Sequence, residues 1–321
     1  MDASFRSYLK LFLVFTKELL GNHQQSYWTF HQEFLIISFE PRKELRLSGF
    51  QIWIGLGIIF VSEILLFIGQ PFIGTYFTPL VWTGYILMID SMIYRQRGSS
   101  LIVNRPGEFL GMLPLSIGLW LIFEFYNLYL RNWHYVGLPE NRLPRWVGYA
   151  WAFATIWPAI LLTAELLQGS RFLASRKVRP LQVTPFILWL SFLVGLGFLV
   201  SPFVAPPEIA VYLAAPVWLG FAFFLDPLNY WLGGRSLFRD LKEGNPRTLY
   251  SLLLAGALCG WLWEFWNFWA GAKWHYTIPI LGHIKIFEMP FLGYLGFPPF
   301  AVECFVMYEF FRRVFHSRKG S

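Results

Sequence analysis

The fold and the candidate site are both organised around residues 261–276, which read WLWEFWNFWAGAKWHY. This stretch lies in an apolar run long enough to cross a bilayer, yet it carries a carboxylate, Glu264, and an amide, Asn267. Residues three apart share one face of a helix, so the two polar side chains should lie side by side. Four tryptophans crowd around them, and the run ends in Trp-His-Tyr. A charge is costly in such a setting, so the stretch is the best lead to function.

A near copy of this stretch lies earlier in the chain. Residues 124–127 read EFYN, where residues 264–267 read EFWN, and a second Trp-His-Tyr follows at residues 133–135. The match extends further at a constant spacing of 136 residues, which joins Trp82 to Trp218, Asp90 to Asp226, Tyr94 to Tyr230 and Ser100 to Ser236. The chain is therefore interpreted as a tandem repeat.

The composition is typical of a polytopic membrane protein. Of the 321 residues, 56% are hydrophobic and 14% charged, whereas a soluble domain is about a quarter charged. Aromatic residues reach 20%, which suits interface belts and helix packing and equally suits a cavity for a flat or polyene-like ligand. The net charge of +7 indicates cytoplasmic loops rather than nucleic-acid binding. Cys259 and Cys304 lie in apolar spans and are interpreted as small core residues.

Eight apolar segments are each long enough to cross ~30 Å of hydrocarbon as a helix. They lie near residues 48–70, 78–94, 109–130, 147–168, 183–204, 210–231, 249–271 and 289–311. Residues 1–44 should form an amphipathic segment on the cytoplasmic surface, or alternatively a short buried helix. Lys and Arg gather in the loops after the second, fourth and sixth spans and in the tail, residues 313–321. This pattern predicts a multi-pass protein of the plasma (inner) membrane with both termini in the cytoplasm.

The fold class predicted is all-α, with about eight transmembrane helices arranged as two parallel four-helix repeats, residues 45–170 and 180–312. Each half holds an even number of spans, so both halves insert in the same direction. They should be related by a pseudo-two-fold axis along the membrane normal. Equivalent residues would then lie at equal depth and could face one another across a central interface.

Carboxylates lie within the expected spans, and no Lys or Arg lies well inside them. They include Glu63, Asp90, Glu124, Glu165, Asp226, Glu264 and Glu303. A charged side chain at the bilayer centre costs at least ~2.5–3.5 kcal/mol. Without a cationic partner, a buried carboxylic acid avoids that cost by staying protonated. We therefore expect several neutral acids in an aromatic setting.

These acids and the motifs around them supply the candidate site. The candidate catalytic residues are Glu264, Glu124, Asp226 and Asp90. The candidate substrate-binding residues are Asn267, Asn127, Trp263, Trp266, Trp274, His275, Tyr276, Trp133, His134, Tyr135, Glu303 and Glu165. Structural alternatives stay open for both sets of acids. Each Glu could form a fold-locking contact with its Asn, and Asp90 and Asp226 could each hydrogen-bond the tyrosine four residues on.

The histidines and the missing motifs narrow the chemistry. His134 and His275 are expected in loops at the interface, and no His-x-x-x-His or comparable spacing accompanies them, so no metal site is predicted. They are better suited to orient a carboxylate or cap a helix end. The chain has no phosphate-cradling Gly-rich loop, nucleophile elbow or CxxCH haem attachment. These absences weigh against an NTP-driven pump and against haem chemistry.

The order of these motifs resembles the membrane lycopene cyclases of the small-subunit and archaeal/fungal type. The matching residues run from Trp263-Glu264 to Tyr276, with Phe287-Glu288-Met289-Pro290 after them, and the first half offers Phe123-Glu124 through Tyr135. The resemblance implies a tandem membrane repeat that acts on long polyenes through acidic residues. The family's Pro-x-Glu-Glu is Pro290-Phe-Leu-Gly here, so the resemblance supports kinship in fold more than in activity.

Three functional hypotheses follow. In the first, a membrane-embedded enzyme cyclises or isomerises a long isoprenoid or carotenoid-like lipid by acid catalysis, with Glu264 or Glu124 as the acid. Such a reaction needs no redox cofactor, and none is predicted. In the second, a non-catalytic subunit binds a pigment, quinone or lipid, or scaffolds a larger membrane complex. In the third, the paired acids serve a proton- or cation-coupled transporter. The expected partner is a membrane lipid or another hydrophobic small molecule.

Overall fold

The structure is a computed structural model that describes residues 41–317, and the remaining residues, including most of the expected amphipathic segment, lie outside this range. The chain is mostly helical. The long helices are α2 (Pro41–Phe67), α3 (Pro71–Arg97), α5 (Pro106–Leu130), α6 (Arg142–Ala154), α7 (Ile156–Gln168), α9 (Pro185–Val204), α11 (Ala214–Trp231), α13 (Arg247–Trp269) and α14 (Phe297–Ser317). The short ones are α4 (Leu101–Asn104), α8 (Arg171–Ala174), α10 (Pro207–Ala210), α12 (Leu237–Lys242) and the 3₁₀ helix η1 (Phe291–Gly296).

Seven of the described helical segments are long and apolar enough to cross a membrane. They are Gly49–Phe67, Pro71–Arg97, Pro106–Leu130, Arg142–Gln168, Pro185–Val204, Arg247–Trp269 and Phe291–Val314. Each overlaps one of the eight spans expected from the sequence. The remaining expected span, near 210–231, corresponds to α11, which packs between α9 and α14 and carries Asp226 and Pro227. The chain is accordingly an all-α polytopic membrane protein at the level of its helices.

Prolines set several helix boundaries. Pro71, Pro106 and Pro185 stand at helix N-termini, where the missing N–H would have no helical partner. The Gln70 and Thr184 side chains cap two of these starts by accepting backbone hydrogen bonds. The fourth span is two helices rather than one, with α6 ending at Ala154 and α7 starting at Ile156. A proline two residues into α7 explains the break, because it cannot donate to the carbonyl four residues back.

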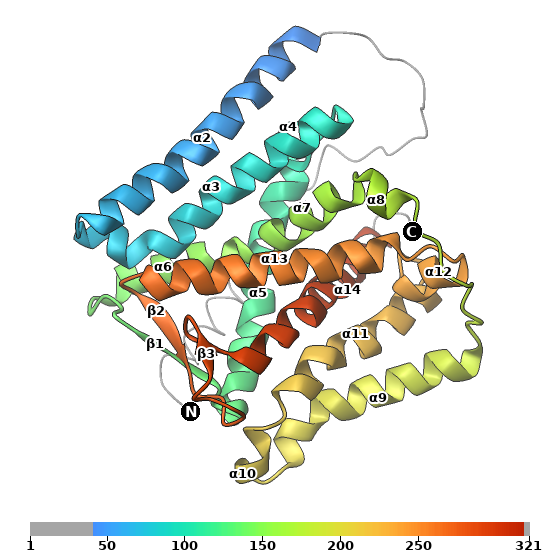
Figure 1. The fold of residues 1–321 in the computed structure, drawn as a ribbon. Helices are drawn as coiled ribbons and strands as arrows, with labels where there is room; N and C mark the ends of the chain where they lie inside the picture. The colour runs from blue at the N-terminus through green and yellow to red at the C-terminus, as the bar shows by residue number, and fades with distance from the viewer. Residues whose placement is uncertain (1–40, 318–321) are drawn as a thin grey trace. The chain divides into compact units, whose positions relative to one another are not determined.

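The centre of the bundle is formed by α7, α13 and α14, which all contact one another. Figure 1 shows α2 beside α3 and α9 beside α11, and both pairs depend on glycine. A Cβ at Gly55 would lie 2.5 Å from the Gly84 carbonyl oxygen, and one at Gly195 would lie 2.8 Å from that of Gly220. Only glycine permits such close helix packing.

The Trp-His-Tyr motifs are strands, which corrects the expectation that His134 and His275 lie in loops. The strand β1 (Trp133–Val136) follows α5, and β2 (Lys273–Tyr276) follows α13. The two pair antiparallel in a two-stranded sheet, with His134 opposite His275. A second small sheet pairs β3 (Lys285–Ile286) with β4 (Met289–Pro290). The all-α expectation therefore missed these short strands, whose pairing joins segments far apart in the sequence.

Candidate functional site

Each strand of the β1–β2 sheet is tied to the helix before it by an asparagine. The Asn267 amide donates to the Trp274 carbonyl oxygen at 2.9 Å and accepts from the Trp274 N–H at 3.0 Å. In the same way, Asn127 donates to the Trp133 carbonyl oxygen at 2.8 Å and accepts from the backbone N–H groups of Asn132 and Trp133. A contact between each of these asparagines and its glutamate was one alternative that the sequence left open. The structure instead shows that they anchor the strands.

Successive side chains of a strand point to opposite faces of the sheet. The tryptophan and tyrosine of each strand point to the same face, toward the helices, where the tyrosines meet Glu124 and Glu264. The histidine between them points to the opposite face. There His134 and His275 stack with ring centroids 6.0 Å apart, and His275 Nδ1 lies 2.8 Å from Glu288 Oε2. Within the described residues, no group of His, Cys, Asp or Glu has the arrangement of a metal site.

Glu124 is the more fully hydrogen-bonded of the two glutamates. Its Oε1 accepts from the Trp120 indole N–H at 2.9 Å, the Trp133 indole N–H at 3.0 Å and the Tyr135 hydroxyl at 2.6 Å. Three donors on one oxygen favour the carboxylate form. Trp120 lies one turn before Glu124 on α5, so its indole reaches the carboxyl along the same helix face.

Glu264 is fully buried and has fewer donors. Its Oε1 accepts from the Tyr276 hydroxyl at 2.8 Å, and its Oε2 has no hydrogen-bond partner among the described residues. The Trp274 indole donates to the Tyr276 oxygen at 2.8 Å. One turn before Glu264 stands Gly260, where the Phe297 ring packs against the helix and no indole is present. The neutral acid is the favoured form at a buried carboxyl with an unpaired oxygen.

An aromatic pocket with an empty volume of about 1070 Å³, its open mouth included, lies beneath the sheet. Both strands contribute to its lining through Trp133, Tyr135, Trp274 and Tyr276. The helices add a larger aromatic set, which includes Tyr76, Trp120, Tyr149, Phe153, Trp218, Trp263, Phe297 and Phe300. Neither Glu124 nor Glu264 lines the pocket. Each carboxyl therefore stands behind a tyrosine whose ring faces the cavity.

The opening of α3 shapes one side of this pocket. Tyr76 departs from helical geometry, with φ −109° and ψ 18°, three residues before Pro79. A proline inside a helix removes one hydrogen bond and kinks the chain. Both Tyr76 and Pro79 line the cavity, and the Tyr76 hydroxyl donates to the Pro144 carbonyl oxygen at 3.1 Å. The kink thus holds the first turns of α3 against α6.

Tyr135 and Tyr276 remain hydroxyl donors across the ordinary pH range. Burial raises the pKa of both phenols well above the usual value of 10.0, and the neighbouring Glu124 and Glu264 carboxyls raise it further. Ionising either phenol beside a carboxylate would place two negative charges in an apolar setting. Each tyrosine can therefore donate or accept a hydrogen bond but does not act as a phenolate.

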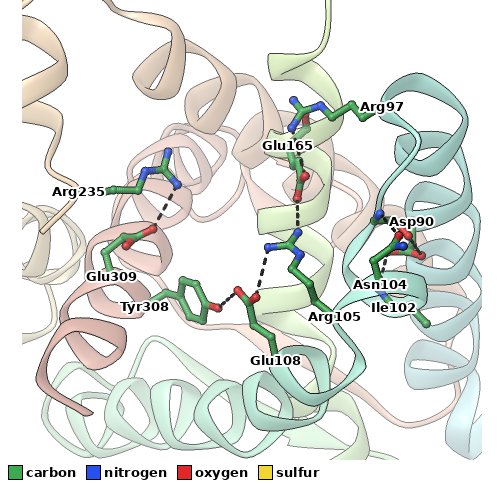
Figure 2. A network of polar contacts seen from close by, with 11 residues as sticks. Asp90, Arg97, Ile102, Asn104, Arg105, Glu108, Glu165, Arg235, Tyr308 and Glu309 are labelled. Carbon is green, nitrogen blue, oxygen red and sulfur yellow. Dashed lines mark hydrogen bonds and ion pairs between the residues drawn. The ribbon is translucent and has the colours of Figure 1, made fainter. Parts of the chain in front are cut away.

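At the opposite end of the bundle, several glutamates form ion pairs with arginines. Figure 2 shows Glu165 between Arg97 and Arg105, and Glu108 between Arg105 and Tyr308. The Arg97–Glu165 distance is 3.2 Å and the Arg105–Glu165 distance is 3.6 Å. The sequence expectation that the acids lack cationic partners is therefore wrong for Glu165, because both arginines reach it from outside its own helix. A related pair joins Glu309 to Arg235 at 3.3 Å.

Asp90 and Asp226 lie toward this end and cap the short helices α4 and α12. Asp90 accepts hydrogen bonds from the Ser100 hydroxyl and the Ile102 N–H, and also from the Gln51 amide. Asp226 accepts from the Ser236 hydroxyl and the N–H groups of Leu237 and Phe238. Asp90 is twelve residues beyond Thr78 of the pocket lining, about 18 Å along a helix. The structure therefore does not bring Asp90 and Asp226 to the pocket.

The other candidate residues divide between the pocket and its surroundings. Trp263 lines the pocket, whereas Trp266 packs on Trp82 at 5.0 Å and donates to Glu63 at 3.3 Å. Glu303 is fully buried on α14, one turn beyond Phe300 of the lining. Neither of its carboxyl oxygens has a hydrogen-bond partner among the described residues, although the Phe221 backbone lies near it.

Sequence reasoning missed several residues of the site. Trp120 was not singled out, although its position one turn before Glu124 is a signal that could have identified it. Arg145 and Tyr149 come from α6, and Trp218 comes from α11. No local pattern connects these residues to the motifs, because tertiary packing alone brings α6 and α11 to the strands. Of the candidate residues from the sequence, the strand aromatics and Trp263 line the pocket, whereas the wall residues from α6 and α11 were not predicted.

Comparison with known proteins identifies no relative: no family model matches the chain, and neither a curated protein nor a solved structure gives a significant match.

Proposed function

We propose that the protein binds a long isoprenoid or carotenoid-like lipid in the aromatic pocket and isomerises or cyclises it by proton transfer. One observation carries this proposal. Two Glu–Tyr pairs, Glu124–Tyr135 and Glu264–Tyr276, present their phenol groups to the same aromatic cavity. Neither carboxyl forms an ion pair with a described Lys or Arg, so no neighbouring cation holds either carboxyl in its ionised form. The distant resemblance to membrane lycopene cyclases agrees with this chemistry.

The two pairs have unequal surroundings, which assigns them different roles. Glu264, with an unpaired Oε2, is the proton donor. Glu124, with three donors on Oε1, is the carboxylate that takes the proton back. Two titratable groups whose environments stabilise the carboxylate to different degrees are the usual arrangement for general acid–base catalysis.

Each tyrosine conducts the proton between its carboxyl and the cavity. A hydroxyl donates one hydrogen bond and accepts two. When Glu264 is protonated, its carboxyl donates to the Tyr276 oxygen, which also accepts from the Trp274 indole, and the phenol O–H is free to point into the pocket. The positions of the carboxyl and phenol hydrogens in this arrangement are assigned from the hydrogen-bond network. Tyr135 stands between Glu124 and the cavity in the same way.

The substrate atoms balance without a co-reactant, and proton exchange with solvent after each turnover removes the proton from Glu124 and returns one to Glu264. The Tyr276 O–H adds its proton to one carbon of a C=C bond, and Glu264 replaces that proton on the phenol. The cation formed at the other carbon is attacked by a second C=C bond of the chain when a ring closes. Loss of a neighbouring C–H proton through Tyr135 to Glu124 restores a double bond, so the product is an isomer. The faces of Trp120, Trp218 and Trp263 would stabilise the cation, by about 2 kcal/mol or more for each desolvated contact.

We further propose that the protein spans the membrane as two parallel repeats, with α11 as an eighth membrane helix. Equivalent contacts in the two halves support this. Gly195 of α9 approaches Gly220 as Gly55 of α2 approaches Gly84, and Asp90 and Asp226 cap equivalent helices. The antiparallel register that places His134 opposite His275 is what a pseudo-two-fold axis between the strands requires. The arginine-rich end would face the cytoplasm of the plasma (inner) membrane.

The lipid that accompanies the protein through a mild-detergent purification tests the proposed reaction. The wild-type protein should carry a mixture that includes product. The double variant Glu124→Gln, Glu264→Gln should carry a lipid of identical mass and different chromatographic retention, because isomerisation leaves mass unchanged. Glu165→Gln, at the arginine-rich end, is the matched control and should carry the wild-type mixture. An unchanged mixture in the double variant would refute the proton-transfer step.

A second candidate is a non-catalytic subunit that binds a pigment, quinone or lipid, alone or within a larger membrane complex. It is favoured by the position of the carboxyls, which stand behind the tyrosines rather than in the pocket lining. In this reading the Glu–Tyr pairs hold the aromatic walls in place. The same purification separates the two candidates, since a binding subunit carries the same lipid or protein partner in the wild type and in the double variant.

A further inference from the structure

The charged side chains that line the pocket are both cationic. They are Arg145, near the start of α6, and Lys273, the first residue of β2. The remaining lining residues are aromatic, aliphatic or uncharged polar groups. An apolar cavity with a positive rim is matched by a ligand that is apolar along its length and anionic at one end.

Arg145 is anchored but not neutralised. Its Nε donates to the Pro139 carbonyl oxygen at 2.8 Å, and one terminal nitrogen donates to the Glu140 carbonyl oxygen at 3.4 Å. These contacts use two of the five guanidinium N–H groups. No carboxylate among the described residues forms an ion pair with it. The side chain is thus fixed by two backbone carbonyls and keeps three donors and its full charge for a ligand.

Lys273 is partly neutralised and plays a secondary role. Its Nζ donates to the Phe268 carbonyl oxygen at 2.9 Å and lies 3.8 Å from Glu288 Oε1. Glu288 is shared with His275, whose Nδ1 lies closer, at 2.8 Å. The ammonium therefore contributes positive potential at the rim but is not as free as the Arg145 guanidinium.

The chain segments that carry the two cations both contact the first turns of α3. Arg145 directly follows Pro144, whose carbonyl oxygen accepts a hydrogen bond from the Tyr76 hydroxyl of α3. Lys273 is placed by the backbone N–H groups of Gly271 and Ala272, which both donate to the Gly74 carbonyl oxygen. Gly74 and Tyr76 are two residues apart, so a single headgroup at this rim could meet both side chains.

We propose that Arg145, assisted by Lys273, forms a headgroup subsite, and that the pocket takes a long-chain isoprenoid with an anionic end, a phosphate or a carboxylate. This inference rests on the proposed function and specifies its substrate class. The guanidinium would pair with the headgroup through parallel N–H···O bonds. The chain would then extend beneath the strands, past Tyr135 and Tyr276. Anchoring the charged end fixes which double bond lies at each tyrosine.

Equilibrium binding of geranylgeranyl phosphate and geranylgeraniol to the purified full-length protein tests this proposal. The phosphate should bind about ten- to a hundred-fold more tightly than the alcohol, the range expected for charge-assisted hydrogen bonds. Arg145→Gln should remove most of that difference, and Lys273→Gln a smaller part. Arg142→Gln, one turn earlier on α6 and outside the pocket lining, is the matched control and should bind both lipids like the wild type.

Three further measurements keep the proposal falsifiable. Added salt should weaken binding of the phosphate but not of the alcohol, a readout that needs no variant. Inorganic phosphate should not displace either lipid, which separates a lipid headgroup from a free anion. Palmitate that binds with the same dependence on Arg145 would extend the subsite to carboxylates. Equal affinity for both prenyl lipids, unchanged in Arg145→Gln, would overturn the headgroup subsite and leave the pocket intact. Failure of both prenyl lipids to bind would instead refute the proposed function.

Discussion

The two ends of the helix bundle hold their acids in opposite ways. At the sheet end, which carries β1 and β2, the partners of Glu124 and Glu264 are tryptophan and tyrosine side chains. At the arginine end, which carries Arg97, Arg105 and Arg235, the partners of Glu165 and Glu309 are guanidinium groups. An arginine fixes a carboxylate in its ionised form, whereas neutral donors leave its proton exchangeable. Of these four glutamates, the two at the sheet end are therefore the ones available for chemistry.

A second difference lies within the sheet end itself. Trp120 stands one turn before Glu124, and Gly260 stands one turn before Glu264. The indole adds a donor to Glu124, while the glycine lets Phe297 of α14 pack against α13 instead. The Trp133 indole also donates to Glu124, whereas its counterpart in Trp274 donates to Tyr276. These two differences give one carboxyl several protein donors and leave the other with an unpaired oxygen. In the proposed reaction, this divergence of the halves supplies both an acid and a base.

The largest expected effect comes from releasing a strand at the sheet end. Asn267→Ala leaves the N–H and carbonyl of Trp274 without their partner, and each unsatisfied group costs about 1–3 kcal/mol. We expect the free energy of unfolding to fall by about 2–4 kcal/mol, as measured by thermal or denaturant unfolding in detergent. Asn141→Ala, which removes an exposed cap of α6, should cost only about 1 kcal/mol. Equal losses in both variants would show that the anchor is not special.

A smaller contrast separates the acids of the two ends. Glu309→Gln removes the charge that pairs with Arg235 and Arg312 and should lower stability by about 1–2 kcal/mol. Glu264→Gln replaces a neutral acid by a neutral amide of the same shape, so no ion pair is lost and the change should be smaller than at Glu309. Unfolding midpoints of the two variants provide the comparison. A loss at Glu264 as large as that at Glu309 would mean that Glu264 is held as a carboxylate.

The smallest effect concerns the phenols in alkaline solution. Because Tyr135 and Tyr276 have a raised pKa in the folded state, their contribution to stability is complete below pH 10. As the pH rises above 10 the unfolded chain loses these protons first, and stability should fall by at most about 1.4 kcal/mol per pH unit for each phenol. The double variant Tyr135→Phe, Tyr276→Phe should show a shallower decline. Parallel alkaline profiles for the two proteins would argue against the raised pKa.

Much of the fold follows from local sequence. Long apolar runs predicted the seven helical segments that are long and apolar enough to cross a membrane, and prolines such as Pro71 and Pro185 mark the starts of some of them. The break at Thr155 and the strands at Trp133 and Lys273 were missed. A strand of four residues is stable here only because it pairs with a second strand and because an asparagine anchors each of the two. The two strands lie about 140 residues apart in the sequence. Such a pairing leaves no periodic signal in either stretch.

The site could be predicted in part for a related reason. Glu124, Glu264 and their aromatic neighbours are recognisable because a charge stands out in an apolar run. The ion pairs of Glu165 were not recognisable, since Arg97 and Arg105 reach it from segments about 60 residues earlier. The role of Arg145 likewise depends on the loop that holds it and on the kink at Tyr76. Side chains that act across helices require the packed structure.

The central claim is that the sheet end holds a protonated acid, and infrared difference spectroscopy of Glu264→Gln against the wild type at neutral pH tests it most directly. We expect the substitution to remove the carbonyl stretch of a protonated carboxylic acid, whereas Glu165→Gln should remove only carboxylate bands. A Glu264→Gln difference spectrum that contains carboxylate bands alone would show that Glu264 is ionised and that the sheet end holds no protonated acid at this position.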